Sequence, residues 1–282
     1  MINYYLLTKP GIILGNLITV ATGFLLASKG RMDGALFFAT LVGLALIIAS
    51  ACVFNNYIDR KIDRKMERTK NRPLVQGLIR GQNAIIFAVF LGVLGSLILF
   101  FYTNVLTVIV AETGFFVYVV LYSLWKCRTI YGTAIGSIAG GVPPLVGYCA
   151  ASNQFDAGAV ILFAILVFWQ MPHFFSIAVY RFDDYKAASI PVLPVKKGMQ
   201  VTKMRMVLYI IGFIGATTAL TLFGYTGYFY LGAAVFFSLA WLALCLKGFI
   251  SSDDQLWGRT MFRFSLVIIT SLSIMIPLDA HM

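Results

Sequence analysis

The chain of 282 residues is short of charge, because only 12% of its residues are charged. Soluble globular proteins carry about 25% charged residues and about 45 to 50% apolar ones, whereas 60% of this chain is hydrophobic and 15% is aromatic. Acidic residues are the scarcest, with 11 against 22 lysines and arginines, for a formal net charge of +11. This composition excludes a soluble globular protein and predicts one that lies in a lipid bilayer.

The chain also lacks paired cysteines. Its four cysteines are far apart, form no C-x-x-C pair and lie in or beside apolar runs, at Cys52, Cys127, Cys149 and Cys245. We therefore expect neither a disulfide framework nor a zinc site. No small-residue cleavage site stands out after the first apolar segment, within 1–28, so we interpret that segment as a retained span and not as a signal peptide.

Long apolar runs occur nine times, and each is close to the roughly 20 residues that a spanning helix needs. They lie within 12–28, 35–54, 84–102, 105–124, 132–150, 157–178, 207–223, 228–246 and 262–278. The expected fold class is all-α, a polytopic membrane bundle of about nine transmembrane helices, in a single intramembrane domain over 1–282. In the fifth run we expect a broken helix, because it contains Gly140, Gly141, Pro143 and Pro144.

Positive charge is distributed unequally between the two sides of the predicted membrane. Lysine and arginine accumulate in the cytoplasmic loops of membrane proteins. If the N-terminus is cytoplasmic, 20 of the 22 lie on the cytoplasmic side, and only Lys29 and Arg31 lie on the other. An odd number of spans then places the C-terminus on the opposite side, and we expect a bacterial cytoplasmic (inner) membrane. The basic residues are thus explained by membrane orientation, and we expect no nucleic-acid partner.

The end of the second span carries a regular set of oxygen ligands. The sequence NNYIDRKID places Asn55, Asp59 and Asp63 at steps of four, so their side chains share one face of a helix, each step advancing about 400°. Two carboxylates one turn apart stay ionised when a cation lies between them, and such oxygen ligands favour Mg²⁺, which adds water and substrate phosphate to its shell. Basic residues around them suit a pyrophosphate, namely Arg60, Lys61, Arg64, Lys65, Arg68, Lys70 and Arg72. Taken singly, these are equally typical of an amphipathic juxtamembrane helix with ion pairs.

Two further elements lie on the same predicted side. Tyr180 and Asp184 repeat the spacing of four, with Asp183 adjacent, and a second carboxylate face opposite the first would allow two metal ions to bracket one pyrophosphate. The alternative is a capped helix end leaving the bilayer. Tyr122 and Lys126 are one turn apart at the end of the fourth span, where they can contact a phosphate oxygen or serve as interfacial anchors.

His173 is the one histidine inside the apolar segments, in the sequence WQMPH. A polar ring at membrane depth is a functional candidate by default, and a hydrogen-bonded structural histidine is the alternative. Glu112 lies in the fourth apolar run and has no predicted role.

Four motifs together resemble the UbiA-type intramembrane prenyltransferases, and within them the haem-farnesylating branch. The motif N-x-x-x-D-x-x-x-D is similar to the first aspartate motif of that family. The four motifs occur in the expected order, so that the resemblance covers essentially the whole chain: TKPGII (8–13), VFNNYIDRKIDRKMERTKNRP (53–73), which contains the aspartate motif, WQMPH (169–173) and DYKAASIPVLPV (184–195).

The resemblance implies transfer of the farnesyl group of farnesyl diphosphate to the 2-vinyl group of protohaem IX (haem B), with addition of water, giving haem O and pyrophosphate. Mg²⁺ is the implied cofactor, and haem B is a substrate. The implied catalytic and metal-binding residues are Asn55, Asp59, Asp63, Asp184 and Lys126, and the implied substrate-binding residues are Tyr122, Tyr180, Arg68, Lys70, Arg72, Asp183 and His173. The family pattern has another aspartate four residues after Asp184, where this chain has Ala188.

Three alternatives accompany this interpretation. A family member can use another acceptor, such as a quinone or chlorophyll precursor. A secondary transporter of an organic anion also has broken helices and membrane-depth polar groups, but here the acidic residues cluster on one side of the membrane and not at its midplane. The third alternative is a non-catalytic assembly scaffold, which explains the hydrophobicity but gives the carboxylate face of Asn55, Asp59 and Asp63 no function. No residue pattern bears on association with a terminal oxidase or haem A synthase.

The charge asymmetry predicts how the chain reacts with a membrane-impermeant label. Residues near Arg68 should stay unlabelled when the reagent is applied outside sealed cells, because the predicted orientation places them in the cytoplasm. Labelling of these residues from outside would contradict the orientation.

Overall fold

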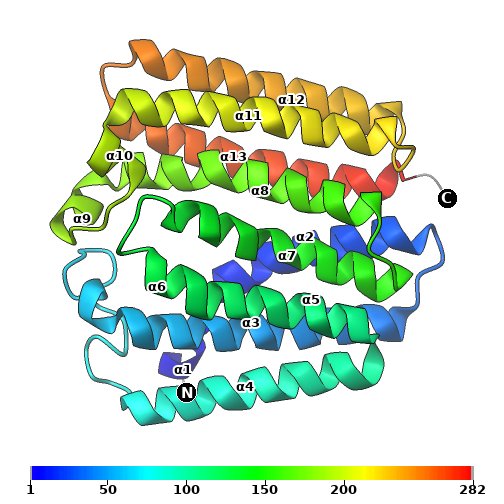
Figure 1. Cartoon of the computed structure of the whole chain (residues 1–282), viewed down its shortest axis with the longest axis horizontal. Coiled ribbons are helices and arrows are strands. Elements are labelled where there is room, and N and C mark those ends of the chain that lie inside the picture. Colours follow the sequence, from blue (N-terminus) through cyan, green and yellow to red (C-terminus); the bar gives the residue numbers. More distant parts are fainter. Residues whose placement is uncertain (1, 281–282) are drawn as a thin grey trace.

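The computed structural model describes residues 2–280, and it is a bundle of long helices (Figure 1). Within this described part, nine helical segments are long and apolar enough to cross a membrane, which confirms the predicted number of spans. They are α2 (Pro10–Ser28), α3 (Gly34–Asp63), α4 (Gly81–Tyr102), α5 to α6 (Val105–Trp125), α7 (Gly132–Ser152), α8 (Ala157–Tyr180), α11 (Met199–Leu222), α12 (Tyr228–Lys247, continued to Ile250) and α13 (Asp254–Leu278).

Short helices and loops occupy the two ends of the bundle. The long helices run side by side from α12 and α11 at one edge to α4 at the other, and α8 lies between α7, α11 and α13 (Figure 1). One end of the bundle carries the 64–80 loop together with α9 (Phe182–Ala187) and α10 (Leu193–Lys197). The short α1 (Ile2–Leu7) packs against α3.

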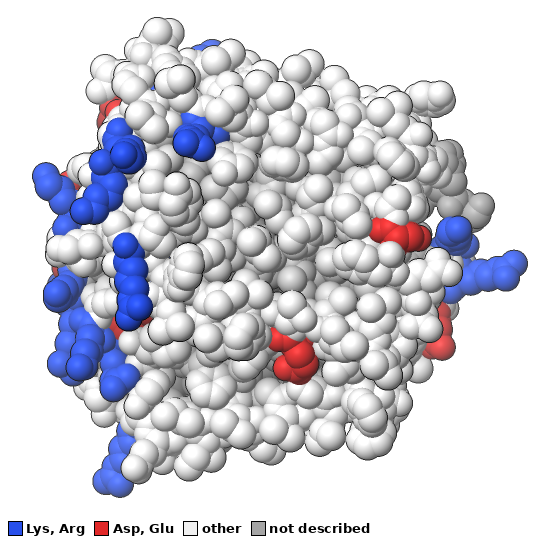
Figure 2. All heavy atoms as spheres, viewed as in Figure 1, with Lys and Arg blue, Asp and Glu red and all other residues white. Residues whose placement is uncertain are grey.

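The basic residues gather at the end of the bundle that carries the 64–80 loop, and few lie at the other end (Figure 2). This is the distribution expected from the sequence, in which two of the 22 basic residues lie on the opposite side. Between the two ends few charged atoms are visible (Figure 2). The exposed side chains include large hydrophobic ones such as Phe90, Phe100 and Phe236, as expected of a surface in contact with lipid.

Several of the scarce acidic residues begin helices. Asp33, Asp156 and Asp253 are the N-caps of α3, α8 and α13, and each side chain accepts a hydrogen bond from a backbone N–H of the first turn. Such caps satisfy donors that have no partner inside the helix. Glu112 has a different role, since its Oε1 accepts a hydrogen bond of 2.6 Å from Ser96 Oγ and so joins α5 to α4.

The helix α7 is continuous through its glycines and prolines, so the predicted break in the fifth span is wrong. Pro143 and Pro144 each lack the backbone N–H that would donate a helical hydrogen bond. The helix α7 is nevertheless packed against α2 on one side and α8 on the other. Gly140 and Gly141 let α8 approach, since a Cβ at these positions would meet Gln170 and Phe163. Packing on both sides holds the helical path that the missing hydrogen bonds alone would weaken.

The helices α2 and α7 are in backbone contact. A Cβ on Gly147 would lie 2.0 Å from the carbonyl oxygen of Val20, and one on Gly23 would lie 2.0 Å from that of Pro144. Small residues at such positions allow transmembrane helices to pack closely. The approach fixes α2 beside α7, and both helices contribute to the cavity described below.

We expect Gly147→Ala to lower the thermal stability of the detergent-solubilised protein. The added methyl group has no space beside Val20, and such overpacking destabilises a well-packed core by about 1 to 3 kcal/mol. Gly232→Ala on α12 is the matched control, because a Cβ there meets nothing within 4 Å. Equal melting temperatures for the two variants would contradict the close contact.

Candidate functional site

A cavity of about 690 Å³ lies among α2, α3, α5, α7, α8 and α13, within the range of small-molecule sites. Its charged lining includes Asp59, Asp63 and Lys126 at the end of the bundle that carries the 64–80 loop. Its lining also includes Leu44, which lies on α3 15 residues before Asp59 and therefore about 22 Å along the helix. The cavity thus has a polar end and a long apolar body.

The polar end is built on the last turns of α3. This helix runs to Asp63, beyond the predicted end of the second apolar run. Asn55, Asp59 and Asp63 all line the cavity and are buried, at 3%, 8% and 5% exposure. The structure therefore places the three predicted oxygen ligands on one face of one helix.

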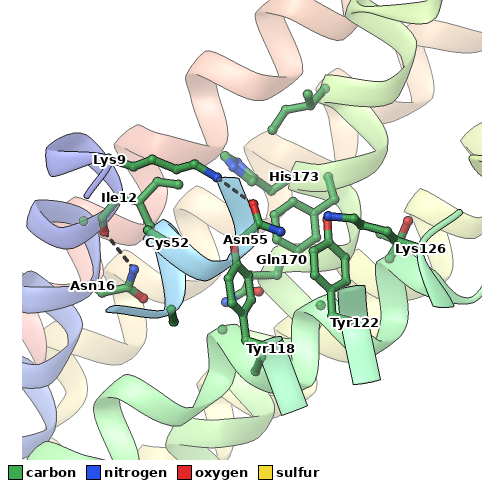
Figure 3. Close-up of a pocket in the computed structure, with 18 of the residues that line it drawn as sticks. Lys9, Ile12, Asn16, Cys52, Asn55, Tyr118, Tyr122, Lys126, Gln170 and His173 are labelled. Carbon is green, nitrogen blue, oxygen red and sulfur yellow. Dashed lines mark hydrogen bonds between the residues drawn. The ribbon is translucent and has the colours of Figure 1, made fainter. Parts of the chain in front are cut away.

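Each of these three side chains is held by a cation from a different segment. Lys9 Nζ donates a hydrogen bond of 2.7 Å to Asn55 Oδ1 (Figure 3). Lys126 Nζ, beyond α6 (Ser123–Trp125), pairs with Asp59 Oδ2, and Arg72 Nη1, from the loop after α3, pairs with Asp63 Oδ2 at 2.7 Å. A row of acceptors and a row of cations therefore face each other at the polar end.

Polar capacity at this end is left unused. Asn55 Nδ2, Asp59 Oδ1 and Gln170 Oε1 are buried and have no hydrogen-bond partner among residues 2–280. Such unpaired groups are costly inside a protein, and all three residues line the cavity. The arrangement has room for a polar ligand that pairs with them.

Lys9 is a site residue that sequence reasoning did not single out. It adopts a left-handed backbone conformation (φ 53°) directly before Pro10, the first residue of α2, and its side chain lines the cavity. Burial lowers the pKa of Lys9 to about 8, because an ammonium group loses its hydration there. A bound polyanion would favour the charged form. The signal in the sequence was a lone lysine next to the proline of TKPGII.

The predicted pair Tyr122 and Lys126 lines the cavity, together with Tyr118. Tyr118 and Tyr122 lie on a π-helical segment, Val117–Tyr122, and their rings stack with centroids 5.4 Å apart. The ammonium group of Lys126 lies 5.0 Å from the centre of the Tyr122 ring. A π-helical turn shifts the register of a helix and is frequent at functional sites, but nothing in the sequence of this segment predicted it.

The second predicted motif does not form a continuous face. The helix α8 ends at Tyr180, Arg181 interrupts it, and α9 begins at Phe182. Asp183 is exposed and its Oδ2 accepts a hydrogen bond of 2.9 Å from Gln255 Nε2. From this motif it is Tyr185 that lines the cavity, and not Tyr180, Asp183 or Asp184. The expected second carboxylate face is therefore not part of the cavity wall.

Of the remaining predicted residues, Arg68, Arg72 and His173 line the cavity. Lys70 does not, and it pairs with the exposed Glu67. Besides Lys9, sequence reasoning missed Tyr118, Tyr185 and Gln170. Gln170 stood in the motif WQMPH and Tyr185 in the motif DYKAASIPVLPV, but neither was singled out. Among the described residues no group of three or more His, Cys, Asp or Glu side chains is placed to hold a metal ion, so a metal here needs the amide of Asn55 or ligand oxygens.

Comparison with known proteins gives the family. The model of the UbiA prenyltransferase family matches residues 16–267. A relative from Protochlamydia amoebophila, named protoheme IX farnesyltransferase, is 62% identical over 280 residues, which are 99% of each chain. A relative of the same name from Sodalis glossinidius is 56% identical over 282 residues, covering 99% of this chain and 95% of the relative.

Solved structures share the fold. A structure described as digeranylgeranylglyceryl phosphate synthase in membranes superposes with a TM-score of 0.82 at 18% identity, over 98% of this chain and 97% of the other. A UbiA homologue from Archaeoglobus fulgidus, bound to GPP and Mg²⁺, superposes with a TM-score of 0.68 at 14% identity, over 98% and 99%. The match to the family model covers most of the chain, and the nine apolar helices of the described part fit it. The chain therefore belongs to the UbiA prenyltransferase family of polytopic membrane proteins.

Proposed function

We propose that this prenyltransferase transfers the farnesyl group of farnesyl diphosphate to the 2-vinyl group of protohaem IX (haem B), with addition of water, releasing pyrophosphate and giving haem O. The observation that carries the proposal is the cavity with a polar end of paired acceptors and cations and a long apolar body. It suits an amphipathic diphosphate. The names of the two relatives support farnesyl as the donor group and haem as the acceptor.

The polar end has the donor set for Mg²⁺. Asn55, Asp59 and Asp63 offer oxygen ligands on one helix face, and Asp59 Oδ1 is buried without a partner in the described structure. Mg²⁺ is commonly bound by one or two carboxylates together with substrate phosphates. The homologue that binds GPP together with Mg²⁺ supports this assignment. When bound, the ion supplies positive charge that stabilises a departing pyrophosphate.

The cations at the polar end bind the diphosphate. Lys9, Lys126 and Arg72 each hold one acceptor of α3, and Arg68 also lines the cavity. With Mg²⁺ held by the oxygens of α3, these cations would be available to donate to the phosphate oxygens. They stabilise the leaving pyrophosphate more strongly than the intact diphosphate, because negative charge grows on it as the carbon–oxygen bond breaks.

The apolar body protects the reacting carbon. Breaking the allylic bond leaves positive charge on the farnesyl group, which the ring faces of nearby aromatic residues stabilise. Phe115, Tyr118, Trp169, Phe174 and Phe262 line the cavity. Exclusion of bulk water prevents early hydrolysis. The vinyl carbon of the porphyrin then forms the new carbon–carbon bond, and the resulting porphyrin-stabilised cation is captured by one water molecule, which loses a proton.

The residues of the second motif keep a predicted role near the diphosphate. For Asp184, Asp183 and Tyr180 to contact a metal-bound diphosphate, α9 has to move toward α3, because these side chains lie outside the cavity wall. Lys70 likewise has to leave Glu67. With Ala188 at the next position of the motif, the chain offers one carboxylate fewer for a second metal ion than the family pattern does.

We further propose that the chain 1–282 acts as one intramembrane domain in a bacterial inner membrane. The basic end of the bundle faces the cytoplasm, with the N-terminus on that side and the C-terminus on the other. The concentration of lysine and arginine at that end supports this orientation (Figure 2).

The reaction itself is tested with the purified protein in detergent, haem B, farnesyl diphosphate and Mg²⁺, with products identified by mass spectrometry. We expect haem O to form, and to disappear with EDTA or in Asp59→Asn, which removes a buried carboxylate from the polar end. Asp33→Asn is the matched control, since it lies at the far end of the same helix and asparagine also caps helices. Farnesol and pyrophosphate without haem O would reject haem as the acceptor. Absence of turnover in folded protein would reject the reaction.

Lys126→Met tests diphosphate recognition. We expect the KM for farnesyl diphosphate to rise at least about tenfold, equivalent to about 1.4 kcal/mol, because a charge-assisted hydrogen bond to phosphate is lost. The KM for haem B should stay unchanged. Lys61→Met, at an exposed position on the same end of α3, is the control. An unchanged KM for farnesyl diphosphate in Lys126→Met would contradict the assignment.

A further inference from the structure

His173 is held by a serine from another helix. Its Nδ1 lies 2.7 Å from Ser265 Oγ, which belongs to α13, and the two side chains are 9% and 0% exposed. The hydroxyl of Ser265 donates to the carbonyl oxygen of Phe262 at 2.6 Å. A serine hydroxyl has a single hydrogen. When that hydrogen lies on the Phe262 oxygen, Ser265 Oγ accepts from His173, and the proton of the neutral imidazole is on Nδ1; this is the tautomer used in the proposal below.

The other ring nitrogen is therefore left with a free lone pair. Nε2 of His173 has no hydrogen-bond partner among residues 2–280, and His173 lines the cavity with Lys9, Asn55 and Lys126 (Figure 3). A histidine with only a structural role would be expected to use both nitrogens when buried. Here one nitrogen is anchored and the other is available to a ligand.

The plane of the imidazole is restrained by its neighbours. The ring of Trp169 stacks on it with centroids 4.6 Å apart and an angle of 24° between planes. Trp169 Nε1 donates to the backbone oxygen of Ser265 at 2.9 Å, so the same residue restrains both members of the pair. The rings of Phe262 and Phe174 lie 5.1 Å and 5.6 Å from the imidazole. The Nε2 lone pair thus has one fixed direction.

We propose that Ser265 is a positioning residue that fixes His173 as the Nδ1–H tautomer, and that Nε2 of His173 is an axial ligand of the iron of the bound porphyrin substrate. The inference rests on the proposed function, because haem is the acceptor only there. Neutral imidazole is a ligand of haem iron, and histidines that bind metals nearly always donate their other N–H to a second group. Iron ligation would hold the porphyrin at a set distance from this wall of the cavity.

The test measures porphyrin binding to the full-length protein in detergent. Ferric haem B is titrated and its absorption spectrum recorded, and metal-free protoporphyrin IX is titrated in parallel. We expect the wild-type protein to give the spectrum of an imidazole-ligated haem. In His173→Ala that signature should be lost and the affinity for haem B should fall at least about tenfold, while metal-free protoporphyrin IX binds as before. Added imidazole should restore the signature.

Ser265→Ala tests the positioning role. Without the serine the imidazole can take either tautomer and can rotate, so we expect about a tenfold loss of haem affinity with a mixed spectrum, and unchanged binding of metal-free protoporphyrin IX. Ser238→Ala is the control, since Ser238 is also fully buried but lies on α12, outside the cavity wall. Its haem spectrum and affinity should equal those of the wild type.

The outcomes separate this inference from the proposed function. An imidazole-type spectrum that persists in His173→Ala overturns iron ligation by His173, even if turnover falls. A wild-type spectrum and affinity in Ser265→Ala overturns the positioning role. If the wild-type protein binds neither haem B nor metal-free protoporphyrin IX, the proposed function fails, and the inference fails with it.

Discussion

The constraint on which the structure depends is that a buried charge in a membrane protein needs a partner. A charged or polar group without one is costly at membrane depth. Within the described structure Lys203 on α11 pairs with Asp254, and the last turns of α3 meet the same requirement three times. Asp59 and Asp63 are held by Lys126 and Arg72, and Asn55 by Lys9. Because the three cations come from different segments, the same contacts that neutralise α3 tie together the start of α2, the end of α6 and the loop after α3.

The helix α2 shows how packing serves the cavity. Near its start, Gly11 and Gly15 line the cavity, where a Cβ would meet nothing within 4 Å. About two turns after Gly15, Gly23 is in contact with the backbone of α7. The first turns of α2 therefore leave space for the cavity at its polar end, and the later turns of α2 pack tightly against α7. The close contact with α7 holds α2, and with it Lys9, beside the acceptors of α3.

The sequence predicted those features that depend on local pattern. The spans followed from long apolar runs, and the row Asn55, Asp59 and Asp63 followed from the helical period. Features that depend on packing were not predictable. The helix α7 continues through its prolines because α2 and α8 pack against it. Neither the interruption at Arg181 nor the position of Asp184 outside the cavity wall has a counterpart in the spacing of the residues. Lys9 reaches Asn55 only because the fold brings together residues that are 46 positions apart.

The concentration of basic residues at one end of the bundle acts beyond the molecule itself. Most of the acidic residues lie at that end too, but they are seven against 20 lysines and arginines, so positive charge predominates there. Its positive potential attracts polyanions from the surrounding solution and raises their local concentration at the mouth of the cavity. Dissolved ions screen this attraction over about 8 Å at physiological ionic strength, but they screen buried ion pairs far less. Ionic strength therefore affects the rate at which an anionic substrate associates with the protein much more than its interactions inside the cavity.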